Sequence, residues 1–222
     1  MCEKIKKITL SSNITSINNG TFIWCNELEK IKIPNNVISI GIQAFRGCIN
    51  LIEIEIPESV ISISDAVFYG CENLEKIKIP IGVITIGKKV FNGCSKLIEI
   101  EIPNSVTSIG SEVFRECIKL EKIIIPNSVI LIGSEAFRGC INLIDIEIPN
   151  NIRYINDGVF RECENLTKII IPNSVISIGI RSFYKCTNLI EIIIPSSMIN
   201  IGFQALYDCP NLKKITIPNT II

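Results

Sequence analysis

The chain has 222 residues and no histidine, and its 22 basic and 22 acidic residues give zero net charge at pH 7. Without histidine it lacks the commonest general base and metal ligand at neutral pH, and without net charge it has no overall field to attract nucleic acid or an anionic membrane. Apolar residues make up 47% of the chain. Charged residues interrupt every apolar stretch, so no run approaches the roughly 18 residues of a membrane span.

The ten cysteines recur every 23 residues without a slip, from Cys2 to Cys209, and nine prolines, from Pro34 to Pro218, each follow a cysteine by nine residues. A strict period of this kind is typical of a solenoid. We therefore predict one repeat array over residues 1–222, with about ten strands and with incomplete first and last repeats. Positions in each unit are counted below from its cysteine, which is position 0.

The first element of each unit is a short strand. In the unit that begins at Cys71, the apolar residues Leu74, Ile77 and Ile79 have the spacing of a strand that turns alternate residues inward. Pro80 then ends the strand, because proline has no amide hydrogen to offer a ladder.

A second apolar stretch follows the proline and closes at position 16, where most residues tolerate positive φ. Its occupants are Asn18, Gly41, Ser64, Gly87, Gly110, Gly133, Asn156, Gly179 and Gly202. We therefore predict a left-handed turn there. Beyond it, Val90, Phe91, Cys94 and Leu97 are spaced by three and four residues, which predicts one or two helical turns with a buried face.

The pattern Ile-Pro-x-Ser-Val-x-x-Ile-Gly-x-x-Ala-Phe-x-x-Cys-x-x-Leu-x-x-Ile-x-Ile-Pro resembles the BspA-type, or treponemal, class of leucine-rich repeats over essentially the whole chain. The resemblance implies a right-handed, curved leucine-rich-repeat superhelix with a parallel β-sheet on one face. Together with the periodicity, it places short helical turns on the other face of the 23-residue units. Members of this class often act as surface-exposed adhesion or antigen proteins, and the class has no catalytic residues to carry over.

The cysteine spacing argues against metal sites and disulfides. The chain has no Cys-x-x-Cys pair, so we expect no metal and no cofactor. On a helical side, stacked cysteines would lie roughly 8–10 Å apart, beyond the limit of roughly 7 Å for bridged Cα atoms. We predict that the cysteines are small buried apolar side chains, with Cys2 alone reactive.

Positions 5 and 7 should project from the open face of the sheet, on strands about 4.8 Å apart. From Lys30 onward the charge at position 5 alternates in sign at every unit, and position 7 begins likewise with Lys32 and Glu55. We predict an ionic zipper in which each charge has opposite neighbours on both sides. Because phosphate binding needs clustered unpaired cations, we expect no nucleic acid partner.

Two surfaces are candidate protein-binding sites. On the sheet, position 7 turns apolar toward the C-terminus, and the candidate residues are Ile124, Glu147, Ile170 and Ile193. Relaxed drift among isoleucine-rich copies explains this pattern equally well. On the opposite side, position 21 forms a stripe with Arg46, Tyr69, Arg115, Arg138, Arg161, Tyr184 and Tyr207, residue types enriched at interfaces. A solvated face is the alternative for this stripe.

Each acid and base belongs to a regular column, and the chain has no phosphate loop or nucleophile motif, so we expect no enzyme. The leading expectation is a non-catalytic protein–protein interaction scaffold that uses the curved sheet face. The chain shows no signal peptide, and we expect it to be cytoplasmic. The alternatives are a surface adhesin or antigen exported by a non-classical route, and a product of repeat expansion that has no partner.

We also expect a monomer. Lys213 and Lys214 of one copy would meet Lys6 and Lys7 of the next if two copies stacked head to tail. Repulsion between these like charges would disfavour such stacking.

Overall fold

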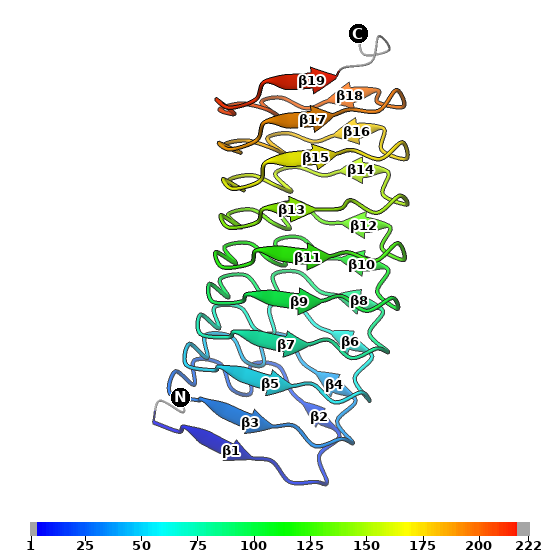
Figure 1. Cartoon of the computed structure of the whole chain (residues 1–222). Helices are drawn as coiled ribbons and strands as arrows, with labels where there is room; N and C mark the ends of the chain where they lie inside the picture. The colour runs from blue at the N-terminus through cyan, green and yellow to red at the C-terminus, as the bar shows by residue number, and fades with distance from the viewer. Residues whose placement is uncertain (1–3, 217–222) are drawn as a thin grey trace.

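The computed structural model describes residues 4–216 as a right-handed solenoid in which each unit of 23 residues makes one turn. Two series of parallel strands run along it, one on the near side and one on the far side of Figure 1. The first series is β1 (Lys7–Thr9), β3 (Lys30–Lys32), β5 (Glu53–Glu55), β7 (Lys76–Lys78), β9 (Glu99–Glu101), β11 (Lys122–Ile124), β13 (Asp145–Ile146), β15 (Lys168–Ile170), β17 (Glu191–Ile193) and β19 (Lys214–Thr216). The second is β2 (Ser16–Ile17), β4 (Ser39–Ile40), β6 (Ser62–Ile63), β8 (Thr85–Ile86), β10 (Ser108–Ile109), β12 (Leu131–Ile132), β14 (Tyr154–Ile155), β16 (Ser177–Ile178) and β18 (Asn200–Ile201).

The first series confirms the predicted parallel sheet and its inward residues. In β7, for example, Ile77 is buried while Lys76 and Lys78 are exposed. The strands pair in chain order as one seven-stranded sheet, β1 to β13, and one three-stranded sheet, β15 to β19. The second series divides into a sheet of β2 to β12 and a sheet of β14, β16 and β18, so both interruptions border the unit that begins at Cys140.

The predicted helical turns are wrong, because residues 4–216 contain no helix. The segment before each cysteine is a run of turns whose N–H groups have two kinds of partner. The N–H groups of Gln43, Phe45 and Gly47 donate to carbonyls of the next unit at 2.7–3.0 Å, whereas those of Ala44 and Arg46 donate to carbonyls three residues back. An α-helix would instead direct every N–H to the carbonyl four residues back. This segment therefore forms a third hydrogen-bonded column between the units.

The left-handed residues also lie elsewhere than predicted. In every unit of the described chain, positions 18 and 22 have positive φ, as at Gln43 and Gly47, with values from 54° to 76°. Position 16 is glycine for a steric reason instead. A Cβ atom on Gly110 would lie 2.6 Å from the carbonyl oxygen of Gly87 in the preceding unit, closer than van der Waals contact permits.

Units without glycine at position 16 replace one hydrogen bond by another. The N–H of Gly41 donates to the carbonyl of Ile17 at 2.8 Å. In the next unit, the hydroxyl of Ser64 donates to the equivalent carbonyl of Ile40 at 2.8 Å. The variation at position 16 thus keeps the same carbonyl satisfied, which a buried acceptor requires.

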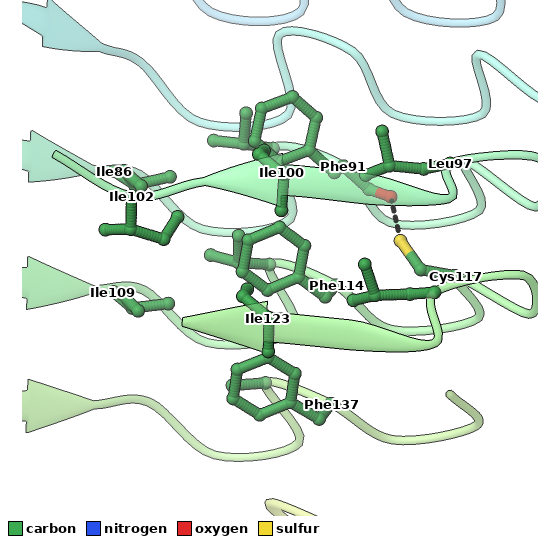
Figure 2. Packing of buried hydrophobic residues seen from close by; sticks show 14 of the residues in the cluster. Ile86, Phe91, Leu97, Ile100, Ile102, Ile109, Phe114, Cys117, Ile123 and Phe137 are labelled. Carbon is green, nitrogen blue, oxygen red and sulfur yellow. Dashed lines mark hydrogen bonds between the residues drawn. The ribbon is translucent and has the colours of Figure 1, made fainter. Parts of the chain in front are cut away.

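A continuous apolar core fills the space between the columns, and a stack of phenylalanines runs through it. Eight rings, from Phe22 to Phe183, stack on one another with centroids 5.2–5.7 Å apart. Figure 2 shows three of these rings, Phe91, Phe114 and Phe137, beneath the strands.

The cysteines from Cys25 to Cys186 are fully buried and Cys209 is half-buried, which confirms the prediction of buried apolar side chains for this part of the chain. The expected separation of 8–10 Å assumed stacked helices, and that premise is wrong, because hydrogen-bonded turns stack on this side. The thiol of Cys117 donates to the carbonyl of Phe91, 26 residues earlier in the chain, at 3.2 Å, and the same bond recurs in the other units from Cys48 onward (Figure 2). Cys2 lies outside the described residues.

Candidate protein-binding face

The open face of the first strand series lines a shallow groove of about 1070 Å³ that runs from β1 to β11. Its walls carry the alternating charges at positions 5 and 7. The register confirms this order, because Lys30 lies opposite Glu53, and Glu53 lies opposite Lys76. The groove therefore presents rows of positive and negative side chains in turn.

The zipper is wrong in its detail, because most charges pair with one neighbour or none. Lys30 Nζ lies 2.8 Å from Glu53, and Lys76 Nζ lies 3.3 Å from Glu99. Among the described residues, Lys122 makes no ion pair within 4.0 Å. A flexible side chain that reaches toward one neighbour moves away from the other, so a column of alternating charges separates into pairs. The remaining charges are open to a partner.

Three further ion pairs show how the face departs from a simple column. Lys78 at position 7 does not reach the neighbouring position 7 carboxylates and instead contacts Glu58 at 2.8 Å. Among the described charges of this face, only Glu191 pairs with both neighbours, with Lys168 at 2.9 Å and Lys214 at 2.6 Å. Hydrogen bonds from Lys214 and Lys168 hold the pKa of Glu191 below its usual value, so this carboxylate stays charged at neutral pH.

The four candidate residues do not form one patch. Ile170 on β15 lies in register with Ile193 on β17; Ile170 is 57% exposed and Ile193 is half-buried. Ile124, which is 68% exposed, lies on β11 opposite Glu101. The exposed Glu147, which follows β13, occupies the unit between these isoleucines. The structure thus brings Ile170 and Ile193 together and separates them from Ile124.

Comparison with known proteins identifies the repeat. The family described as BspA type Leucine rich repeat region matches residues 1–121 and 107–222, in six copies. The chain belongs to this family. No curated protein matches it.

Three solved structures resemble this BspA-type chain. The T. pallidum leucine rich repeat protein TpLRR is 29% identical with a TM-score of 0.68, and the match covers 73% of this chain and 78% of TpLRR. A leucine-rich repeat protein from Bacteroides ovatus is 27% identical with a TM-score of 0.54, over 99% of this chain and 80% of that one. A leucine rich cell surface protein from Faecalibacterium prausnitzii is 25% identical with a TM-score of 0.55, over 95% of this chain and 78% of that one.

Three arginines of the position 21 stripe form ion pairs with glutamates of the BspA-type array; they are Arg115, Arg138 and Arg161. Glu135 lies 3.1 Å from both Arg115 and Arg138, and Glu162 lies 3.2 Å from Arg138 and 3.1 Å from Arg161. Burial opposes the charge of Arg138, but hydrogen bonds to Glu135 and Glu162 outweigh it and raise the pKa of this guanidinium. The predicted secondary site therefore presents charges that already have partners.

The stripe continues as an aromatic ladder beyond the arginines. The guanidinium of Arg161 lies 5.0 Å from the ring centroid of Tyr184, and Tyr184 stacks on Tyr207 at 5.4 Å. At the other end of the stripe, Arg46 lies between Trp24 and Tyr69, at 5.6 and 4.8 Å from their rings. Cation–π contacts of this kind fix long side chains in place. The stripe joins successive units of the BspA-type array through their side chains.

The chemistry of the cysteines and acids is limited in this fold. Burial raises the pKa of the thiols of Cys71, Cys117, Cys163 and Cys186 well above the usual range, so they remain neutral. Within residues 4–216, no group of three or more Cys, Asp or Glu side chains is arranged to hold a metal ion. None of the described segments forms a helix able to span a bilayer.

Sequence reasoning missed a column of exposed isoleucines at position 13. Within residues 4–216 these are Ile38, Ile61, Ile84, Ile130, Ile176 and Ile199, and together with Thr15, Thr107 and Arg153 at the same position of the other described units we name them the isoleucine strip. Five of the six isoleucines are 53–69% exposed. The sequence could have predicted this column, because positions 12 and 13 are both apolar in most units. Adjacent residues of an extended segment cannot both face the core, so one of the two had to be exposed.

Proposed function

We propose that this chain is a non-catalytic protein-interaction scaffold whose sheet face binds a protein partner. The observation that carries the proposal is the open face itself. It combines charges without an internal partner, such as Lys122, with the exposed isoleucines Ile124 and Ile170. Exposed apolar side chains rimmed by charge are typical of protein-binding surfaces. Membership of the BspA-type family supports a binding role.

The proposed contact centres on Ile170 and Ile193, which the register places side by side. Lys168 and Glu191 flank them on the same strands and are paired at 2.9 Å, so they offer hydrogen bonds around the apolar centre. An apolar centre with a polar rim is the usual anatomy of a protein interface.

The test is quantitative affinity capture from lysate of the source cell with the native chain and with the double variant Ile170→Glu, Ile193→Glu. We expect one partner to be enriched by the native chain and lost with the variant. Titration of the purified partner should then show affinity at least about tenfold weaker for the variant, because two buried apolar contacts become charged.

The matched control is Ile38→Glu with Ile61→Glu, which adds the same charge at side chains that are 59% and 61% exposed on the isoleucine strip. This control should capture the partner normally. Equal capture by the sheet-face variant, or no enrichment by any chain, would refute the proposed function.

The second candidate function is a surface-exposed adhesin or antigen. It is supported by the likeness to the F. prausnitzii protein, whose name describes it as a cell surface protein. Protease treatment of intact cells separates the two roles. Digestion of the chain supports surface display, and protection supports a cytoplasmic scaffold.

A further inference from the structure

Of the four arginines in the position 21 stripe, Arg46 alone has no carboxylate partner among residues 4–216. Arg115, Arg138 and Arg161 each lie 3.1–3.2 Å from at least one glutamate. No described acidic side chain lies within 4.0 Å of Arg46, and its Nε atom is buried without a hydrogen-bond acceptor. Buried donors without a partner are uncommon in folded proteins, so this arginine calls for an explanation.

The sequence accounts for the missing partner. The glutamates beside the other arginines come from positions 18 and 22 of the same unit or of the next one, as Glu112 and Glu135 do for Arg115. Around Arg46, the same positions hold uncharged residues, namely Gln43 and Gly47 in its own unit and Ala66 and Gly70 in the next. This unit therefore keeps the cation of the stripe and lacks the anion.

Two aromatic rings hold the guanidinium of Arg46 in place. Its Cζ atom lies 5.6 Å from the ring centroid of Trp24 in the preceding unit and 4.8 Å from that of Tyr69 in the following unit. The N–H of Trp24 donates to the carbonyl of Arg46 at 2.7 Å, and the indole leaves no room for a Cβ atom at Gly47. The long side chain is therefore ordered before any ligand arrives, which lowers the entropic cost of binding.

The open part of the Arg46 guanidinium is its outer edge, with the Nη1 and Nη2 atoms. The residue is half-buried, and Nε is its one side-chain nitrogen that is both buried and unpartnered. The two terminal nitrogens have no acceptor among the described residues either, so they are accessible to solvent. A carboxylate binds such a planar edge through two parallel hydrogen bonds.

We propose that Arg46, held between Trp24 and Tyr69, binds a carboxylate group of an acidic peptide ligand. A carboxylate is the favoured anion because glutamate carboxylates fill the equivalent place beside the other three arginines of the stripe. The flanking rings also keep water from the cation, which strengthens its attraction to an anion at the open edge. The three residues belong to the turns before the cysteines, so this inference is independent of the proposed partner at the sheet face.

The chain carries its own reporter for this site, because Trp24 is its only tryptophan. The test is titration of the full chain with the capped peptide acetyl-Gly-Glu-Gly-amide at constant ionic strength. We expect a saturable change in the emission of Trp24 with a dissociation constant of roughly 10 mM, since a single charge-assisted contact holds the peptide. The same peptide with glutamine in place of glutamate should give no saturable change.

Two variants distinguish binding at Arg46 from binding elsewhere. Arg46→Gln removes the cation and should weaken the peptide at least tenfold. Gln43→Glu keeps the cation and adds a carboxylate three residues before it, in the place from which Glu112 reaches Arg115 at 3.1 Å. This variant should weaken the peptide to a similar extent, because its own carboxylate then occupies the site. The matched control is Arg115→Gln, at the same position of a unit that has glutamate partners, and it should bind the peptide as the native chain does.

Circular dichroism and the urea midpoint check that each variant is folded. An equal response of the native chain to the glutamate and glutamine peptides would overturn the proposal. So would undiminished binding by Gln43→Glu, which would place the peptide elsewhere on the chain. Inorganic phosphate is the second probe, and saturation by phosphate without any response to the glutamate peptide would overturn the assignment of a carboxylate.

Discussion

Replacing Phe114 with leucine should destabilise the array more than the same change at Phe22. Phe114 is fully buried in the middle of the phenylalanine stack, with ring centroids 5.6 Å from Phe91 and 5.4 Å from Phe137. Phe22 stands at the first described end of the stack, and of the described rings it stacks on Phe45 alone, at 5.2 Å. The two substitutions have the same chemistry and differ in the number of stacked neighbours.

The magnitude follows from this difference. Leucine keeps most of the apolar volume, and swaps of this kind usually cost about 1 kcal/mol. Each lost ring pair adds about 1 kcal/mol beyond the buried area. The free energy of unfolding should therefore fall by about 3 kcal/mol for Phe114→Leu and by about 2 kcal/mol for Phe22→Leu.

The assay is urea unfolding followed by far-UV circular dichroism and by the fluorescence of Trp24. Coincident transitions would show that the array unfolds as one unit, which the free energies require. Losses equal within about 0.3 kcal/mol, or a larger loss for Phe22→Leu, would show that stacked neighbours do not set the cost.

Two more predictions concern the column contacts. Gly110→Ala should lower the free energy of unfolding by about 2 kcal/mol or more, because the new Cβ atom would lie 2.6 Å from a carbonyl oxygen. The control Gly82→Ala, whose Cβ atom would have no neighbour nearer than 3.9 Å, should be neutral or stabilising by about 0.5 kcal/mol. Equal losses for the two variants in urea unfolding would contradict the steric argument. Burial raises the pKa of the Cys71 and Cys117 thiols, so their contribution is complete below the unfolded thiol pKa of roughly 8.5 and is lost as the pH rises above it. The urea midpoint should fall between pH 7 and pH 10 and fall less in Cys117→Ala; a flat midpoint would count against this reasoning.

The strand prediction succeeded because the inward residues Ile77 and Ile79 are two residues apart and Pro80 ends the segment. The helix prediction failed because spacings of three and four have two explanations. They fit an α-helix, and they also fit a run of turns in which alternate N–H groups bond to the next unit. The hydrogen bonds to the neighbouring unit decide between the helix and the run of turns. The sequence of a single repeat does not contain that information.

The left-handed positions were missed for a related reason. Glycine occupies six of these eighteen described positions, but side chains as different as Gln43, Lys89 and Trp24 occupy others, so residue type gave only a partial signal. Glycine at position 16 gave a false signal of a left-handed residue, because the close approach of two backbones also requires glycine. On the sheet, the sequence specified the order of charges, but the reach of each side chain determined which ones pair.

The turn column also sets the shape of the array. A solenoid bends when its two sides have different spacings, as when broad helices back a sheet. Here the phenylalanine rings of the core repeat every 5.2–5.7 Å, against about 4.8 Å for paired strands, so the spacing at the ring stack and at the sheet differs by roughly 0.7 Å per unit. Such an array follows a wide arc rather than a horseshoe. A rigid partner can therefore contact many units at once only if its own surface is nearly straight.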